Sequence, residues 1–308
     1  MPKRVYIIVG PTAVGKSDVA LAVAQKLDAW IISADSRQIY VGMDIGTAKP
    51  AEVERSKVKH LLIDIVNPDQ VFTAAEFLDA AKDAINFASE CGKNALIVGG
   101  TGLYVRALVE GFDLAETPPV DEIRDEIVSR LEEKGLENLA NELHQLDPEA
   151  ANEIDLQNPH RVIRALEIIK ATGKPLKQAR GKTAAVDYEF SVVGLRRERE
   201  SLNERIRNRT YAMINSGWID EVRELMKSSF PENSPAMSGI GYMEIRQYLK
   251  GEITKEMAIE KIIIRTRQYA KRQMTWFNSD DYIQWVDLNP EDEPRNIAQK
   301  VYNLFMGG

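Results

Sequence analysis

The stretch that decides the fold is Val5–Leu27, VYIIVGPTAVGKSDVALAVAQKL. It begins with a β-branched apolar run, Val5–Val9, which has the length of a buried strand and ends at Gly10. It closes with Ser17–Leu27, a segment rich in Ala, Val and Leu that has the length of a helix. A strand, a glycine-containing loop and a helix in this order are the unit from which parallel α/β sheets are built.

The loop inside this stretch carries the strongest chemical signal of the chain. The loop fits the pattern G-x-x-x-x-G-K-[ST], which forms a phosphate-binding P-loop between a strand and a helix. Its residues are Gly10, Pro11, Thr12, Ala13, Val14, Gly15, Lys16 and Ser17. Its backbone N–H groups are predicted to bind a di- or triphosphate, Lys16 to neutralise the terminal oxygens and the Ser17 hydroxyl to ligate Mg²⁺. The alternative is a glycine-containing turn with a surface lysine. The motif points to a phosphate-bearing ligand and leaves the reaction open.

Further apolar runs of buried-strand length follow, with helix-length segments between most of them. They are Trp30–Ala34, Leu61–Val66, Ala95–Val98, Val192–Leu195 and Ile283–Val286. Alternating strands and helices predict a mostly parallel sheet that is covered by helices on both faces. We therefore predict an α/β fold with a P-loop NTPase-like parallel sheet, and we expect helices over about Leu202–Met226 and Lys255–Phe277 to pack onto it.

The alternation stops between about Asp113 and Tyr188, where helical patterns dominate. This segment starts in a Pro-Pro turn and contains three predicted helices, Val120–Lys134, Leu136–Gln145 and Pro159–Thr172. Gly173 follows the last of them and suits the residue after a helix C-terminus. We expect a P-loop catalytic core made of residues 1–113 and 189–308, and a helical insertion domain made of residues 114–188.

The charge of the chain is unevenly distributed. The 308 residues carry a formal net charge of −7, which argues against general attraction to nucleic acid or membrane. Leu156–Lys182 nevertheless contains seven basic residues and Glu167 as its one acid, and Lys261–Arg272 contains five basic residues and no acid. Each segment is either a solvated surface or an RNA-binding face, and charge alone favours the solvated surface.

Cysteine content and the N-terminus indicate the cellular compartment. Cys91 is the single cysteine, so the chain has no internal disulfide and no cysteine-based metal site. The first ten residues hold only a short apolar run before a Gly-Pro break, which is typical of neither a signal peptide nor a membrane span. We expect a cytoplasmic protein without a membrane partner.

Two loops that follow predicted strands carry residues suited to chemistry. Asp35–Tyr40 and Gly99–Tyr104 each follow a strand, and Gly42–Pro50 lies between them in the sequence. Open α/β sheets bind ligands beyond the carboxyl ends of their strands, so these loops are expected at one site. Asp35 can serve there as a Mg²⁺ ligand or general base, or it can cap a helix, and the residues alone do not decide between these roles.

These motifs together resemble those of a known family. Seven motifs are spread over nearly the whole chain. They are GPTAVGKS, ADSRQIYVGMDIGTAKP, GGTGLYVRAL, NPHRVIRALEI, GWIDEV, IGYMEI and TRQYAKRQMTWF. They follow one another in an order that resembles the bacterial tRNA dimethylallyltransferase (isopentenyltransferase) family. The resemblance implies transfer of a dimethylallyl group from dimethylallyl diphosphate to the exocyclic N6 amine of the adenosine just 3′ of the anticodon. Diphosphate is released, and the P-loop would hold the diphosphate of the donor.

The resemblance also implies roles for individual residues. Asp35 is expected to contact the amine and to act as the general base. Lys16, the Mg²⁺ ion held by Ser17, and Arg209 are expected to stabilise the negative charge of the leaving group. Thr101 is expected to position the adenosine or the phosphates. Two neighbouring basic residues, Arg205 and Arg207, are interpreted as a solvated helix face.

The partner implied by the resemblance is the anticodon stem-loop of tRNA, with the target base turned out of its stack. The family pattern indicates tRNA contacts at Asp35, Ser36, Arg37, Gln38, Thr101, Arg124, Pro159, His160, Arg161, Val162 and Ile163. We expect the chain to act as a monomer.

Other functions share many of these features. A P-loop kinase acting on a nucleotide or small metabolite would use the same sheet, loop and Mg²⁺, and the basic insertion could serve as its lid. A non-catalytic RNA-binding ATPase and an enzyme that prenylates free adenine nucleotides are further alternatives. Protection of the fold by dimethylallyl diphosphate, with none from ATP, separates the prenyltransferase from the kinase.

Overall fold

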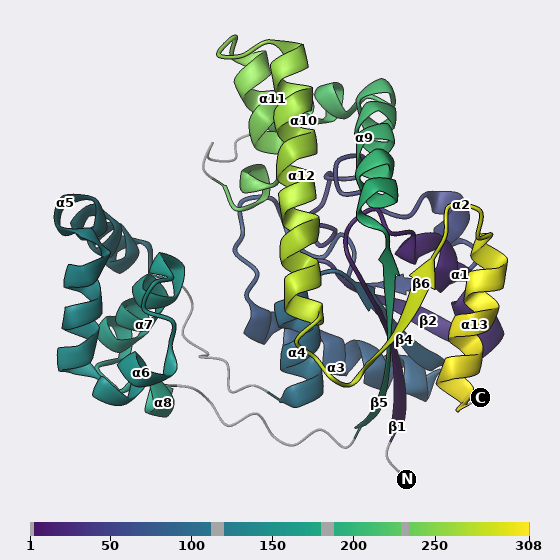
Figure 1. Ribbon diagram of the computed structural model, residues 1–308, viewed down its shortest axis with the longest axis horizontal. Helices are drawn as coiled ribbons and strands as arrows, with labels where there is room; N and C mark the ends of the chain where they lie inside the picture. Colours follow the sequence, from purple (N-terminus) through teal and green to yellow (C-terminus); the bar gives the residue numbers. More distant parts are fainter. Residues whose placement is uncertain (1–2, 112–119, 180–187, 229–233, 308) are drawn as a thin grey trace. The chain divides into compact units, whose positions relative to one another are not determined.

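The computed structural model describes residues 3–111, 120–179, 188–228 and 234–307 (Figure 1). The chain divides into two compact units, which we call the core unit and the helical unit. The core unit comprises Met1–Phe72, Glu76–Val109 and Asp187–Gly308, and the helical unit comprises Thr73–Ala75 and Glu110–Val186. The turn expected at 117–119 lies outside the described residues.

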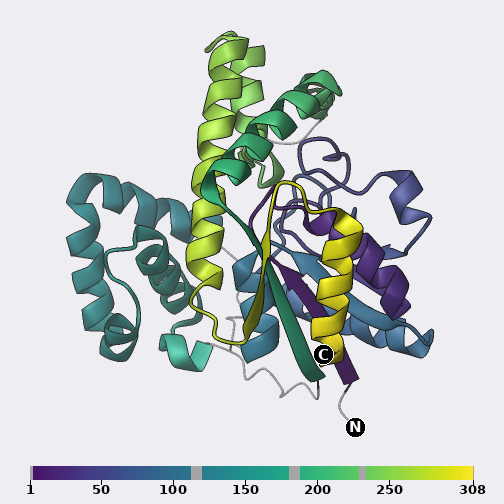
Figure 2. The same cartoon turned by 45° about the vertical axis from the view of Figure 1, so that its right-hand side comes forward.

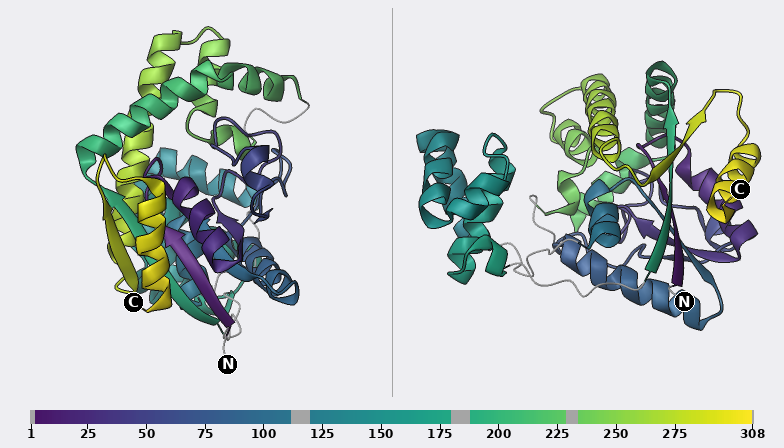
Figure 3. Two further views of the ribbon diagram at one scale, coloured as in Figure 1. Left: turned by 90° about the vertical axis from the view of Figure 1, so that its right-hand side faces the viewer. Right: turned by 60° about the horizontal axis from the view of Figure 1, so that its bottom comes forward.

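The core unit contains one six-stranded sheet in which every pair of neighbours is parallel, with the strand order β3-β2-β4-β1-β5-β6. The strands are β1 (Lys3–Val9), β2 (Ala29–Ala34), β3 (His60–Leu61), β4 (Asn94–Gly99), β5 (Tyr188–Arg197) and β6 (Ile283–Leu288). Figure 3 shows β1 and β5 side by side, and Val9 at the end of β1 pairs with Gly99 and Gly194. The predicted α/β fold with a parallel sheet is confirmed.

Helices cover the sheet. They are α1 (Lys16–Leu27), α3 (Ala74–Glu90), α4 (Gly102–Glu110) and α13 (Pro294–Met306), whereas the short helix α2 (Glu52–Arg55) has no buried residue. Helices α1 and α13 lie side by side (Figure 2), and Tyr6 of β1 packs on Phe305 of α13 with ring centroids 5.0 Å apart. Phe77 of α3 stacks on Tyr104 of α4 at 4.1 Å. Burial of these aromatic and aliphatic side chains is the main source of stability of the core.

A second group of helices follows β5 in the sequence (Figure 1). It contains α9 (Arg199–Asn215), α10 (Trp218–Lys227), a 3₁₀ turn (Ala236–Ser238), α11 (Tyr242–Leu249) and α12 (Lys255–Phe277). The helix predicted over Lys255–Phe277 is confirmed, whereas the single helix predicted over Leu202–Met226 is wrong. Gly217 interrupts it with a φ of 100°, a conformation that glycine adopts without strain.

The strand predicted over Leu61–Val66 is also largely wrong. Strand β3 ends at Leu61, because Leu62 and Asp64 adopt left-handed φ angles of 59° and 57°. The Asp64 carboxylate is bound by Lys49 and Arg55, so ion pairs fix this turn where apolar periodicity suggested a strand. Only Val66 returns to an isolated parallel bridge with Tyr40.

The helical unit consists of α5 (Asp121–Leu146), α6 (Pro148–Glu153), α7 (Pro159–Thr172) and α8 (Leu176–Ala179). Helix α7 has the predicted bounds, with Asn158 as N-cap and Gly173 in the left-handed conformation after its end. Gly135 breaks α5 between the two helices predicted there. Within the described ranges of the chain, no helix is both long and apolar enough to span a membrane.

Candidate active site

The P-loop connects β1 to α1 in the predicted place. Gly10 has a φ of 145°, and a Cβ atom there would lie 2.4 Å from the carbonyl oxygen of Leu195, so only glycine fits. Lys16 Nζ donates to the carbonyl oxygens of Gly10 and Pro11 at 2.8 and 2.9 Å. Burial lowers the pKa of Lys16 to about 8, with Arg209 adding to this effect and Asp35 opposing it.

Side chains from three distant elements hold the P-loop. The Thr12 N–H donates to Gln273 Oε1 of α12 at 2.8 Å, and Gln273 Nε2 donates to the Gly100 carbonyl at 2.8 Å. Arg205 Nε of α9 donates to the Ala13 carbonyl at 2.8 Å, and Arg197 Nε of β5 donates to the Val14 carbonyl at 3.1 Å. Arg205 is exposed, as its interpretation as part of a solvated helix face implies, but its guanidinium also binds the loop, which that interpretation did not include. Sequence reasoning missed Arg197, and it assigned no role to Gln273, although Gln273 lies in the TRQYAKRQMTWF motif.

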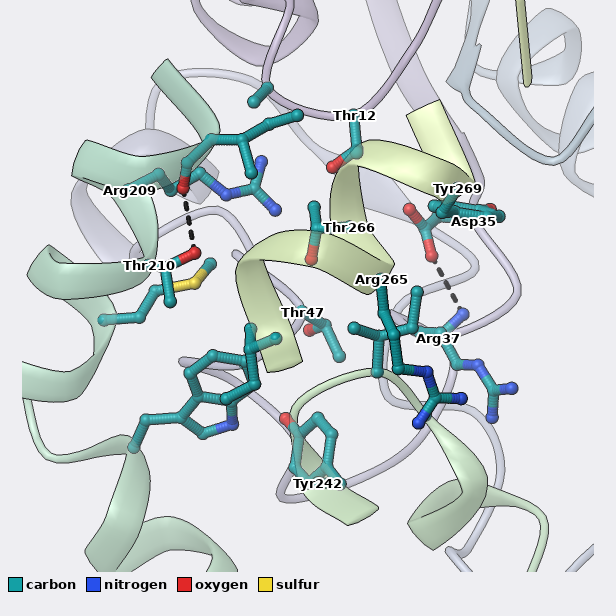
Figure 4. A pocket seen from close by; sticks show the side chains of 18 of the residues that line it. Thr12, Asp35, Arg37, Thr47, Arg209, Thr210, Tyr242, Arg265, Thr266 and Tyr269 are labelled. Atoms are coloured by element: carbon teal, nitrogen blue, oxygen red, sulfur yellow. Dashed lines mark hydrogen bonds between the residues drawn. The ribbon is translucent and has the colours of Figure 1, made fainter. Parts of the chain in front are cut away.

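Two cavities adjoin the loop. The P-loop cavity has a volume of about 520 Å³ and is lined by Lys16, Ser17 and Asn208 among others. The second cavity has a volume of about 340 Å³ and is lined by Tyr242 and by apolar side chains of α9 and α12 (Figure 4). The residues that line both cavities are Thr12, Ala13, Asp35, Thr47, Arg209 and Tyr269. A ligand that bridges the cavities therefore passes between the P-loop and Asp35.

Helical periodicity explains how α9 serves both cavities. Ile206, Thr210 and Met213, spaced by three or four residues, line the second cavity, whereas the P-loop cavity receives Arg205 and Ala212 from the adjoining face. Arg209 lies between these two faces and lines both cavities. The low mean hydropathy of this helix hides the pattern from a search for an apolar stripe.

Asp35 follows β2 and lies in the cavity wall rather than at the start of a helix. Its Oδ1 accepts a hydrogen bond from the Arg37 N–H at 2.9 Å, which closes a turn (Figure 4). The residues after Asp35 form turns, so the helix-cap alternative is wrong. Burial lowers the pKa of Arg209, while the negative charge of Asp35 opposes that shift and stabilises the charged guanidinium. Asp35 and Arg209 thus form an acidic and a basic group on one wall.

Thr101 lies behind this wall and lines neither cavity described above. Its Oγ1 accepts from the Ser36 N–H at 3.1 Å, and its side chain is hydrogen-bonded to Tyr269. Burial, followed by the charge of Asp35, raises the pKa of Tyr269 to about 12. These hydrogen bonds let Thr101 position the loop that carries Asp35. Its expected role in positioning the adenosine or the phosphates stays a prediction.

A carboxylate on α10 holds the loop that forms the opposite wall. Glu221 accepts hydrogen bonds from the N–H groups of Asp44, Ile45 and Gly46 at 2.6–3.2 Å, and from the Tyr242 hydroxyl at 2.7 Å. The same loop accepts hydrogen bonds from Gln38 Nε2 through the carbonyls of residues 47 and 48. These contacts connect the GMDIGTAKP and GWIDEV motifs, whose relation is invisible in the sequence.

Replacing Glu221 by glutamine is expected to destabilise this wall. An amide nitrogen in place of either carboxylate oxygen would face hydrogen-bond donors, since both oxygens accept from N–H or O–H groups. We expect Glu221→Gln to lower the free energy of unfolding by about 1.5–3 kcal/mol in urea denaturation. Glu224→Gln, at an exposed position of the same helix, is the control, and equal stability of the two variants would contradict the argument.

The residues expected to contact tRNA fall into two sets. In the core unit, Ser36 and Arg37 line the second cavity and Gln38 lines the P-loop cavity; Arg37 Nη1 also donates to the Pro235 carbonyl at 2.7 Å. In the helical unit, His160 and Arg161 at the start of α7 are exposed, and Pro159 is half-buried.

The other positions of the helical unit are less accessible. The side chains of Val162 and Ile163 lie in the core of the unit with 0% and 4% exposure, so they support α7, and the tRNA contact expected at these positions stays a prediction. Arg124 Nη1 binds the fully buried Glu167 at 3.2 Å.

The basic surface predicted over Leu156–Lys182 is also less positive than its sequence suggests. Acids from other helices approach it, because Glu126 of α5 binds Lys170 and Glu149 of α6 binds Lys177. Arg180 and Lys182 lie outside the described residues.

A parallel sheet with a lysine-bearing P-loop after an inner strand, and cationic side chains around that loop, define an α/β protein whose site is suited to a phosphorylated ligand. The family model described as IPP transferase matches residues 38–280. The chain is 43% identical to the tRNA dimethylallyltransferase of Alkaliphilus oremlandii over 308 residues, which cover 100% of this chain and 98% of that protein.

Solved structures of the same kind of enzyme are similar to this chain in fold. The tRNA isopentenylpyrophosphate transferase of Bacillus halodurans superposes with a TM-score of 0.71 at 37% identity, covering 99% of this chain and 97% of the other. A eukaryotic dimethylallyltransferase acting on tRNA gives a TM-score of 0.78 at 27% identity, covering 97% and 77%. The chain belongs to the IPP transferase family.

Proposed function

We propose that the chain transfers a dimethylallyl group from dimethylallyl diphosphate to the exocyclic N6 amine of the adenosine 3′-adjacent to the anticodon in tRNA. The observation that carries this proposal is the shared wall of the two cavities. It places the carboxylate of Asp35 and the guanidinium of Arg209 between the P-loop cavity and the second cavity. The names of the related proteins, tRNA dimethylallyltransferase, support the same reaction.

The reaction is a displacement in which the amine nitrogen forms a bond to the allylic carbon as the bond from that carbon to the diphosphate oxygen breaks. The nitrogen loses a proton, which Asp35 accepts. The electron pair leaves with the diphosphate, whose charge Lys16 and Arg209 stabilise. These half-buried cations are effective here because their surroundings screen charge less than bulk water does.

Mg²⁺ fits the donor set of the P-loop cavity. The Ser17 hydroxyl and the carboxylates of Asp18 and Asp35 line it, and oxygen ligands are those that Mg²⁺ prefers. Ser17 would hold the ion together with the phosphate oxygens. The ion would neutralise charge on the diphosphate, while the side chains of the loop orient it.

The anticodon stem-loop is the proposed acceptor region. Exposed His160 and Arg161 of the helical unit, with Ser36 and Arg37 of the core unit, supply the polar groups for it. The second cavity would receive the adenine turned out of its stack. The chain would act as a monomer in the cytoplasm, where its substrate is found.

The proposal is tested with an unmodified tRNA transcript, dimethylallyl diphosphate and Mg²⁺, followed by mass spectrometry of the digested nucleosides. A prenylated adenosine at the position 3′ of the anticodon is expected with dimethylallyl diphosphate, and none with ATP as the donor. Formation of ADP from ATP without prenylation would instead support the kinase alternative, which the comparisons do not favour.

A further inference from the structure

Four cationic side chains surround the P-loop, and the proposed mechanism uses two of them. Lys16 and Arg209 act on the donor, whereas Arg197 and Arg205 have no part so far. Burial is the first cause that lowers the pKa of Arg197 and of Arg209, and the positive charge of Arg205 contributes to both shifts. Mutual repulsion of this kind is relieved when an anion binds among the charges.

Arg205 and Arg197 use their guanidinium groups differently. Arg197 donates hydrogen bonds from Nε to the Val14 carbonyl and from Nη1 to the Asn289 carbonyl, the latter at 2.7 Å. It lines neither cavity described above. Arg205 lines the P-loop cavity. Among the described residues, its guanidinium donates one hydrogen bond, from Nε to the Ala13 carbonyl. Its Nη2 would lie 3.7 Å from a Cβ atom built on Gly15, beside the N-terminus of α1.

We propose that Arg205 is a second arginine of the diphosphate site, anchored through Nε on the Ala13 carbonyl and binding a phosphate group through its Nη atoms. This proposal rests on the proposed function for the identity of the donor. It assigns a ligand-binding role to a residue that the sequence placed on a solvated helix face.

The anchor accounts for how an exposed side chain can bind tightly. A free arginine loses much rotamer entropy when it orders around a phosphate, but here the Nε hydrogen bond has already restricted the side chain. The remaining N–H groups suit the forked recognition of phosphate oxygens that a lysine cannot reproduce.

The position of Arg205 predicts which kinetic constant it controls. Arg205 lines the P-loop cavity and not the second cavity, whereas Arg209 lines both, as Asp35 does. Arg205 therefore faces charge that is present before the reaction, while Arg209 faces charge that develops as the allylic bond breaks. Loss of Arg205 should raise the KM for the donor and leave the single-turnover rate at saturating donor within a few-fold.

The test compares Arg205→Met, Arg205→Lys and Arg207→Met, the last an exposed neighbour on α9 that lines neither cavity. Affinity for inorganic pyrophosphate with Mg²⁺ is measured by titration calorimetry, with circular dichroism to establish folding. We expect Arg205→Met to weaken binding by roughly 10- to 100-fold, Arg205→Lys to recover part of that loss, and Arg207→Met to bind as the parent chain does.

Two results would overturn the proposal. Pyrophosphate affinity of Arg205→Met equal to that of Arg207→Met would remove Arg205 from the site. Equal losses in the methionine and lysine variants would mean that Arg205 acts only through the Ala13 carbonyl. Neither result depends on prenylation, so a chain that binds pyrophosphate through Arg205 but fails to modify tRNA would refute the proposed function alone.

Discussion

Asp35→Asn is expected to reduce the single-turnover rate of prenyl transfer by roughly 10²–10⁴-fold. The amide keeps the shape of the carboxylate and can still accept the Arg37 N–H that closes the turn, but it cannot accept the proton of the amine. Rapid-quench measurement with saturating tRNA and donor checks this result. Binding of tRNA should stay within a few-fold of the parent chain, because the loop conformation is retained.

Thr101→Val is the matched comparison for this experiment. It removes the acceptor for the Ser36 N–H while leaving the Asp35 carboxylate in place. A positioning role predicts a smaller loss of rate than in Asp35→Asn. A near-parental rate in Asp35→Asn would mean that another group, or solvent, takes the proton, and that Asp35 serves the loop alone.

Lys16→Met is expected to lower kcat/KM for dimethylallyl diphosphate by about 10²–10³-fold, because it removes a half-buried cation from the diphosphate. Methionine has a similar length and avoids placing a polar group in the loop. Unchanged donor affinity and turnover in this variant, measured by calorimetry and steady-state kinetics, would remove the P-loop from the mechanism.

The pH dependence of donor binding provides a second readout for Lys16. Burial lowers its pKa to about 8, so the protonated form that attracts an anion dominates below that pH and is lost as the pH rises above it. Pyrophosphate affinity of the parent chain should therefore fall between about pH 8 and pH 10. The ratio of the parent chain's affinity to that of Lys16→Met at each pH cancels the titration of pyrophosphate itself. A ratio that does not change with pH would contradict the role of Lys16 in donor binding.

Local signals in the sequence were sufficient for much of the sheet and for the P-loop. Gly173 ends α7 where a helix-terminating glycine was expected, and Gly10 lies where only glycine fits against Leu195. These features depend on backbone conformation within a few residues, which the residue type determines directly.

Predictions failed where distant residues decide the conformation. The run Leu61–Val66 has strand-like composition, but Lys49 and Arg55 bind Asp64 and turn the chain. Arg205 looked like one of several helix-surface arginines until its Nε hydrogen bond to the Ala13 carbonyl was seen. Glu221 lies in the GWIDEV motif, but the motif does not indicate its role, because the N–H groups that it binds lie about 175 residues earlier in the sequence. Such long-range contacts produce no periodic pattern in the sequence.

The two hydrogen bonds that Lys16 donates to backbone carbonyls have a consequence for ion selectivity. Its ammonium group already donates to two backbone carbonyls, so an incoming anion must interact with the ammonium more strongly than those carbonyls do. Chloride, with one charge and no directional acceptor geometry, gains little from that exchange, whereas a diphosphate presents several charged oxygens at once. We therefore expect the P-loop to bind diphosphate in preference to the abundant monovalent anions of a cell at physiological salt.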